Sequence, residues 1–124
     1  MIHGIGTDII DVDRIALLVE KSAFLIRVFH DNEVSYCIKK KTGSQESFAA
    51  RFAAKEALVK ALGTGLRGNL NLNEMEVATT AMGQPFFILH GSTKSTFSDF
   101  KIKKIHLSLS HLEKIAQAFV VLEA

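Results

Sequence analysis

Three charged residues, Asp8, Glu56 and Lys60, have the types and spacing of a site that handles phosphates. Asp8 follows the Gly4-x-Gly6 pair at the end of an apolar segment, where carboxylates approach ligands but also cap helices. Glu56 lies among alanines in a helix-prone segment, and Lys60 follows four residues later, the favourable order for an ion pair on a helix. A helix cap at Asp8 and an exposed Glu56–Lys60 pair explain the same residues without a ligand.

A polar row at His106, Ser108 and Ser110 alternates with apolar residues near the end of the chain. Because side chains alternate across a strand, all three lie on one face of the predicted strand. Such a row suits a solvent-exposed face or a site that hydrogen-bonds a phosphate or an amide. It does not predict a Ser-His-Asp triad, because neighbours on one strand point outward together and need not meet.

The carboxylates and the basic residues fit one kind of site. Asp8 and Glu56 supply hard oxygen ligands of the kind that Mg²⁺ prefers, and such sites take further ligands from water and substrate phosphates. Lys60, Arg51 and His106 would then contact phosphate oxygens through charge-assisted hydrogen bonds. This combination indicates phosphoryl transfer, although spacing alone does not establish it.

Periodicity and turn signals predict the elements that position these residues. Ser44 is suited to cap a long helix ending at Leu62, and Gly63 to terminate it. The last two strands are expected to form a hairpin, with residues 115–122 central and buried on both faces. The fold class is α+β, a mainly antiparallel sheet packed on the long helix. The expected helices cover residues 12–28, 31–41, 44–62 and 92–100, and the expected strands cover 2–9, 70–80, 86–89, 105–110 and 115–122.

Composition restricts the class of protein. With 124 residues, 48% hydrophobic and 23% charged, the chain has the size of one globular domain, residues 1–124. The single cysteine, Cys37, excludes an internal disulfide and any four-cysteine metal site. No segment resembles a signal peptide or approaches the ~18 apolar residues of a membrane span, which favours a cytoplasmic protein. Residues 14–67 carry ten Lys or Arg against five Asp or Glu. That excess suits an anionic partner, or simply solvated helix faces.

Three sequence blocks occur in the order and spacing of a known family. They span residues 4–15, with Asp8 and Arg14, residues 48–65, with Glu56 and Lys60, and residues 106–123, beginning at His106. Over nearly its whole length the chain resembles the holo-acyl-carrier-protein synthases, the short bacterial 4'-phosphopantetheinyl transferases, and the second block is the most specific. The resemblance implies the 4'-phosphopantetheinyl transferase fold. It also implies transfer of phosphopantetheine from coenzyme A to a serine of apo-acyl carrier protein, with release of adenosine 3',5'-bisphosphate, in support of fatty acid biosynthesis.

The resemblance implies a role for each matching residue. Asp8 and Glu56 inherit the Mg²⁺ site, and Lys60 inherits contact with the pyrophosphate and stabilisation of the leaving group. The family often has lysine where this chain has Gln84, so one phosphate contact is missing or comes from another basic residue. The acceptor of the serine proton stays open among Glu56, Asp8 and a water bound to the metal. The positions of the coenzyme A pocket are Arg51, Lys60, Gly63, Gly83, Gln84, Pro85, His106 and Ser108.

The resemblance also implies partners. The carrier protein is acidic, and the basic residues Arg14, Lys21 and Arg27 are the expected docking residues. Family members of this length form homotrimers with each active site between two subunits, which makes Phe119 and Val121 candidate interface residues. Neither nucleic acid nor a membrane is an expected partner.

Two other functions fit the residues without the resemblance. One is a non-enzymatic binder of RNA or nucleotides that uses the basic middle of the chain and its phenylalanines, although these match no RNA-binding motif and suit a core. The other is a structural oligomer in which Glu56 and Lys60 form only an ion pair. Only the transferase is expected to show thermal stabilisation by coenzyme A that depends on Mg²⁺. Neither the nucleotide binder nor the structural oligomer predicts this.

Overall fold

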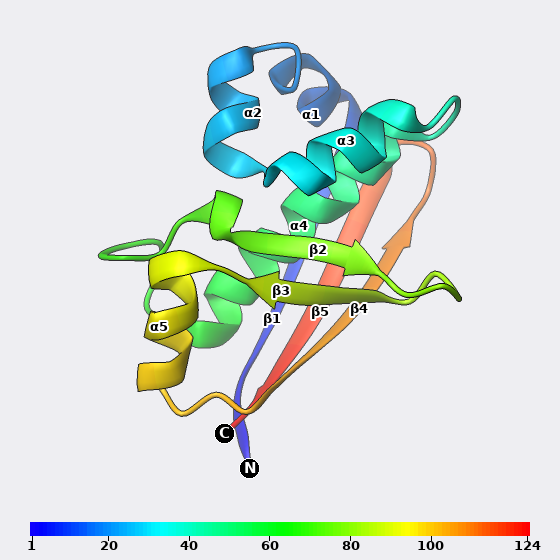
Figure 1. The fold of residues 1–124 in the computed structure, drawn as a ribbon. Helices are drawn as coiled ribbons and strands as arrows, with labels where there is room; N and C mark the ends of the chain where they lie inside the picture. The colour runs from blue at the N-terminus through cyan, green and yellow to red at the C-terminus, as the bar shows by residue number, and fades with distance from the viewer.

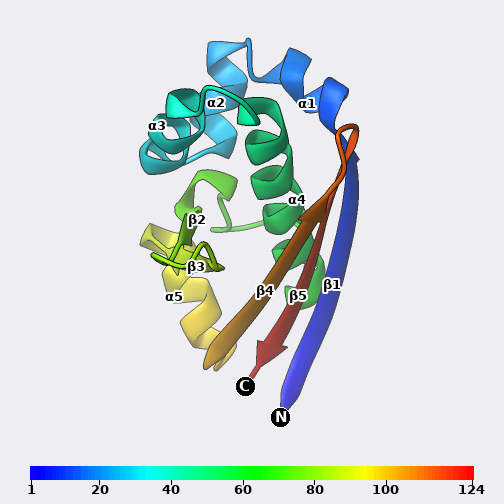
Figure 2. The same ribbon diagram turned by 90° about the vertical axis from the view of Figure 1, so that its right-hand side faces the viewer.

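A computed structural model describes residues 1–124 as two antiparallel sheets with a long helix between them. The larger sheet has the strand order β1-β5-β4. One face of this sheet packs on α4 (Ser44–Leu62), and the small β2-β3 sheet lies on the other side of that helix (Figures 1 and 2). The five strands are β1 (Ile2–Asp11), β2 (Met75–Thr79), β3 (Pro85–Leu89), β4 (Lys104–His111) and β5 (Ile115–Glu123).

The remaining helices close the two ends of this arrangement. The short helices α1, α2 and α3 gather at one end of α4, and α5 covers the other end beside β3 (Figure 1). The two chain termini meet at the end far from α1, where Ala124 N donates to Met1 O over 2.8 Å. None of the helices is long and apolar enough to cross a lipid bilayer. The short helices are α1 (Val12–Leu18), α2 (Ser22–Val28), α3 (Asp31–Lys39), the 3-10 turn η1 (Leu72–Glu74) and α5 (Gly91–Asp99).

Two glycines of β1 set its distance from α4. A Cβ on Gly4 would overlap the carbonyl oxygen of Ala61, and a Cβ on Gly6 would overlap that of Ala57. The alanines of α4 leave equally little side chain in the contact, so strand and helix backbones approach closely. The neighbouring strand completes this face with four small or aliphatic side chains, all buried: Ala116, Ala118, Val120 and Leu122.

The α+β class, the antiparallel pairing and the bounds of the long helix are confirmed, whereas one sheet was expected and two are present. The expected helix over 12–28 is wrong in one respect, because the chain turns between α1 and α2. Ile15 and Phe24 are both buried, and nine residues of straight helix would put them on opposite faces. Ser44 does not cap α4, since Gly43 takes the cap position with φ 79° and no side-chain cap bond.

The strand β5 is central, as expected, but its burial on both faces is wrong for a single chain. Its residues alternate between exposed and buried along most of the strand, because only one face meets α4. Phe119, on the outer face, is 44% exposed. Both faces of β5 carry apolar side chains, which led to the prediction that both are buried. In a single chain only the face that packs on α4 is buried.

A buried ion pair joins three elements around α4. Lys55 is fully buried and donates to Glu33 Oε1 over 2.6 Å. Its Nζ also donates to the carbonyl oxygens of Leu72 and Met75, at 2.9 and 2.7 Å. The other carboxylate oxygen of Glu33 accepts from Val77 N over 3.0 Å. Together these bonds attach α3 and β2 to α4, and they satisfy charges that are otherwise costly to bury.

We expect Lys55→Met to lower the free energy of unfolding by about 3–5 kcal/mol, because it leaves the Glu33 carboxylate buried without its cation. Urea denaturation measures the loss. Lys94→Met, an exposed change in α5, is the control and should stay within about 0.5 kcal/mol of the parent.

The double variant Lys55→Met/Glu33→Gln should recover part of the lost stability, since it removes the uncompensated charge. A single Lys55→Met variant as stable as Lys94→Met would show that this ion pair does not hold the helices and the small sheet together.

Candidate active site

Asp8 and Lys60 form an ion pair across the contact between β1 and α4. Asp8 lies on the same face of β1 as Gly4 and Gly6, two residues further along the strand. Lys60, in the last turn of α4, donates to Asp8 Oδ1 and to the carbonyl oxygen of Thr7, both over 3.0 Å. The Asp8 side chain is 16% exposed and that of Lys60 is 55% exposed. The pair therefore lies at the rim of the core, within reach of a ligand.

Glu56 stands next to this pair, one helical turn before Lys60. Burial raises the pKa of the half-buried Glu56 carboxyl, and the charge of Asp8 raises it further. Lys60 and Arg14 oppose this shift. No hydrogen bond joins Glu56 to Lys60, whose carboxylate partner is Asp8. The structure thus brings together Asp8, Glu56, Lys60 and Arg14.

Both ligand-free explanations of these residues are wrong. Asp11, not Asp8, caps α1, because its carboxylate accepts from the backbone nitrogens of Asp13 and Arg14. The ion pair of Lys60 crosses to another element instead of joining two positions of one helix. What remains is two adjacent carboxylates that repel one another, a donor set that a hard divalent cation would satisfy.

Arg51 lies apart from this group, on the side of α4 that faces α3. Its guanidinium donates to Ser47 Oγ over 2.7 Å and lies 4.4 Å from the ring centre of Tyr36. The Nε atom is buried without a hydrogen-bond partner. Hollows of about 220 and 180 Å³ adjoin the side chain, one lined also by Asn32 and the other also by Lys40. Arg51 therefore keeps an unused donor beside open space.

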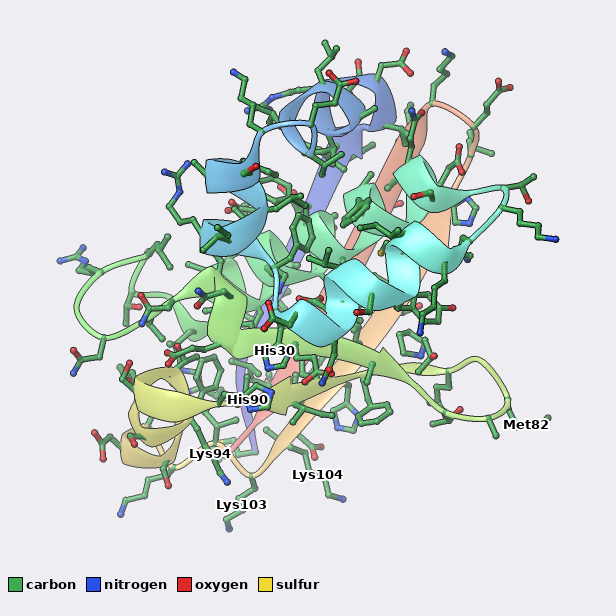
Figure 3. All side chains as sticks on the ribbon, turned by 45° about the horizontal axis from the view of Figure 1, so that its top comes forward. His30, Met82, His90, Lys94, Lys103 and Lys104 are labelled. Atoms are coloured by element: carbon green, nitrogen blue, oxygen red, sulfur yellow. The ribbon has the colours of Figure 1, made fainter.

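The glycines of the expected coenzyme A pocket lie in two separate turns. Gly63 ends α4 with φ 90°, just beyond Lys60. Gly83, with φ 88°, and Gln84 lie in the exposed turn between β2 and β3, and Pro85 begins β3. Gln84 N donates to Thr80 Oγ1 over 3.1 Å, which holds the turn together. Figure 3 labels Met82 at the tip of this turn, where it projects from the body of the molecule.

His106 and Ser108 are not brought together with Asp8 within one chain. In the sheet register they stand opposite Val121 and Phe119, on the outer face, whereas Asp8 is on the face that packs on α4. His106 Nε2 lies 3.2 Å from Glu123 Oε2, which lowers the pKa of the Glu123 carboxyl. Strand alternation, which groups these polar residues correctly, does not tell which side of the sheet the helix covers.

The expected docking residues are exposed at the end of the molecule that the short helices form. Arg14 is in α1, Lys21 precedes α2 and Arg27 is in its last turn. The family resemblance implies only a docking role for Arg14, but its charge also lowers the pKa of Glu56. No sequence signal predicts this second contact, because it depends on how α1 packs over α4.

Comparison with known proteins agrees with this fold. The family model of the 4'-phosphopantetheinyl transferase superfamily matches residues 4–120. A holo-acyl-carrier-protein synthase of Geotalea daltonii is 45% identical over 125 residues, 99% of each chain. The crystal structure of such a synthase from Neisseria meningitidis superposes with a TM-score of 0.91 at 35% identity, covering all of both chains. One from Bacillus anthracis, in complex with CoA (3',5'-ADP), gives 0.83 at 36% identity, covering 100% of this chain and 98% of that one.

This chain belongs to the 4'-phosphopantetheinyl transferase superfamily and, within it, to the holo-acyl-carrier-protein synthase family. The resemblance in the three sequence blocks is thereby confirmed.

We expect Glu56→Gln to raise the melting temperature at pH 8 in EDTA, because it removes a carboxylate that burial and Asp8 disfavour. The native state binds the Glu56 proton more tightly than the unfolded state does. Stability therefore falls as pH rises from the ordinary pKa of 4.5 through the raised value. The gain should vanish at pH 4, where the carboxyl is protonated in both states.

Glu46→Gln is the matched control, since Glu46 lies in the first turn of the same helix, where a carboxylate is favourable. If Glu56→Gln does not raise the melting temperature at pH 8, the inference that burial and Asp8 disfavour the charged Glu56 carboxylate is wrong.

Proposed function

We propose that this protein transfers the 4'-phosphopantetheine group of coenzyme A to a serine of apo-acyl carrier protein, releasing adenosine 3',5'-bisphosphate. The observation that carries the proposal is the group formed by Asp8, Glu56 and Lys60 in the fold of this family. The relatives in the family bear the name of this activity, and one of them was solved with coenzyme A bound. The reaction would take place in the cytoplasm and supply fatty acid biosynthesis.

Asp8 and Glu56 would hold Mg²⁺. Their fit to the ion rests on the burial of Glu56 and the charge of Asp8 beside it, which together raise the pKa of Glu56. No hydrogen bond joins Glu56 to Lys60, so its carboxylate is not already paired with that ammonium. When bound, the ion neutralises phosphate charge and orients the pyrophosphate. Two carboxylates leave most of an octahedral shell to water and to substrate oxygens, as is usual for Mg²⁺.

Lys60 would stabilise the leaving group. Its ammonium is anchored by Asp8 and by the carbonyl of Thr7, so it is positioned before the substrate arrives. Positioning and charge neutralisation dominate phosphoryl transfer, in which the protein does little covalent chemistry.

The coenzyme A pocket would be completed by a second copy of the chain. His106 and Ser108 lie on the outer face of the sheet, away from Asp8, and a neighbouring subunit can bring its own pair to the site. The same face carries apolar side chains that a trimer would cover, including Ile5 at 61% and Phe119 at 44% exposure. In the same subunit as the metal site, Arg51 offers its unused Nε to a phosphate.

The proposal is tested by the intact mass of apo-acyl carrier protein after incubation with this protein, coenzyme A and Mg²⁺. We expect a gain of one phosphopantetheinyl group, lost when EDTA is added and lost with Glu56→Ala, because both remove the proposed metal site. No gain with any apo-carrier protein, together with no stabilisation by coenzyme A and Mg²⁺, would overturn the proposal.

We expect Arg14→Glu and Arg27→Glu to slow modification of the acidic carrier protein and to leave coenzyme A binding unchanged. Basic residues steer an acidic partner, so the loss should be greatest at low salt and should appear in kcat/KM. Arg27→Glu is the cleaner variant, because Arg14 also acts on Glu56. Lys94→Glu, on the opposite end of the molecule, is the charge-matched control, and equal rates for all variants at low salt would refute docking on this surface.

A further inference from the structure

Two histidines and a glutamate meet on the side of the molecule that carries the small sheet, away from Asp8. The imidazoles of His30 and His90 are stacked, with ring centres 4.5 Å apart and planes 18° from parallel. His90 Nε2 lies 2.8 Å from Glu76 Oε1, and His30 Nδ1 lies 3.8 Å from the same oxygen. One potential ligand atom from each residue lies within 4.8 Å of the others. Figure 3 shows the two labelled histidines side by side.

Three different elements hold these side chains in place. His30 caps α3 in a reciprocal capping box, because its backbone nitrogen donates to Glu33 Oε1, over 3.0 Å. Glu76 is the second residue of β2. His90 lies between β3 and α5, where its backbone nitrogen donates to the carbonyl oxygen of Glu74, over 2.9 Å. The three ligands are therefore presented by structured backbone and not by mobile loops.

The carboxylate of Glu76 is the unusual member of the group. Its side chain is only 7% exposed, and its oxygens are bonded to the His90 ring and, at 3.2 Å, to the amide of Asn32. A carboxylate removed from water is stabilised far better by a cation than by neutral donors. The nearest buried ammonium, that of Lys55, is bonded to Glu33. The cluster thus has a negative charge at its base and two imidazoles at its mouth.

We propose that His30, Glu76 and His90 form a second metal site, one that binds a Zn²⁺ ion. Two imidazoles and one carboxylate are a donor set that Zn²⁺ uses, and they differ in kind from the all-oxygen set that Mg²⁺ prefers. The imidazole side chains are 28% and 37% exposed, which leaves a fourth position open to water. The bound ion would fasten α3, β2 and the start of α5 to one another.

Binding changes two hydrogen bonds and keeps a third. His90 Nε2 ligates through its lone pair, so its hydrogen moves to Nδ1 and the bond to Glu76 is replaced by the ion. His30 Nδ1, which accepts from Asn32 N over 3.1 Å, gives its lone pair to the ion instead. The bond from the Asn32 amide to Glu76 Oε2 persists and orients the carboxylate, a support that commonly changes metal affinity about 10–100-fold.

Calorimetric titration of the full chain with Zn²⁺, in excess Mg²⁺ to occupy carboxylate-only sites, tests the proposal. We expect one Zn²⁺ per chain and a weakening of at least about tenfold in both His90→Ala and His30→Asn. Asparagine keeps the capacity to cap α3, so the second variant removes the ligand without removing the cap. Zn²⁺ should also raise the melting temperature of the parent protein and not that of His90→Ala, since only a folded state that binds the ion gains stability.

His106→Ala is the matched control, because it removes the other histidine that lies beside a carboxylate, Glu123. It should leave the Zn²⁺ affinity unchanged. The proposal is overturned by absence of one-to-one binding, or by a Zn²⁺ affinity that His90→Ala and His30→Asn leave unchanged. Circular dichroism of each variant without metal separates a lost ligand from a lost fold.

Discussion

The close approach of β1 to α4 is the constraint on which the candidate site depends. Gly4 and Gly6 lie against the backbone of Ala57 and Ala61, and no larger residue fits at either glycine without moving the strand. Because Asp8 follows two residues later on the same strand face, its carboxylate comes within 3.0 Å of Lys60. A wider separation would put the two carboxylates and the lysine out of each other's reach. The glycines thus fix the distances between charged groups that they never touch.

One helix carries two lysines with opposite surroundings. Lys55 is enclosed by α3 and β2, and its ammonium is fully satisfied by Glu33 and two backbone carbonyls. Lys60, five residues later, lies at the rim with one carboxylate and one carbonyl, so it keeps capacity for a phosphate. The buried Lys55–Glu33 pair stabilises the packing of α3 and β2 on α4. The Lys60–Asp8 pair at the rim can rearrange when a ligand binds. Helix α4 separates the two kinds of site because its faces meet different layers.

Local patterns predicted the parts of this fold that depend on neighbouring residues. The bounds of α4 follow from a helix-prone, alanine-rich segment ended by Gly63, and the pairing of β4 with β5 follows from alternation and a short connection. The burial of Lys55 was not predictable, because its partner Glu33 is 22 residues away and belongs to another helix. The positions of His106 and Ser108 relative to Asp8 were equally unpredictable from the sequence. Alternation groups side chains by face, but only the packed structure decides which face the helix covers.

The pairing of β1 with β5 has a consequence for the order in which the protein folds during its synthesis. Asp8 belongs to β1, and β1 pairs with β5, so residues 2–11 find their partners only among residues 115–123. On a ribosome, β1 is synthesised before β5 and must wait for it, so the large sheet cannot close until β5 has left the exit tunnel. Pairing at this sequence separation is also slow, because the loop entropy is lost before the contacts form. Asp8, one of the two carboxylates proposed to bind a metal, therefore lies on a strand that completes its sheet pairing late in folding.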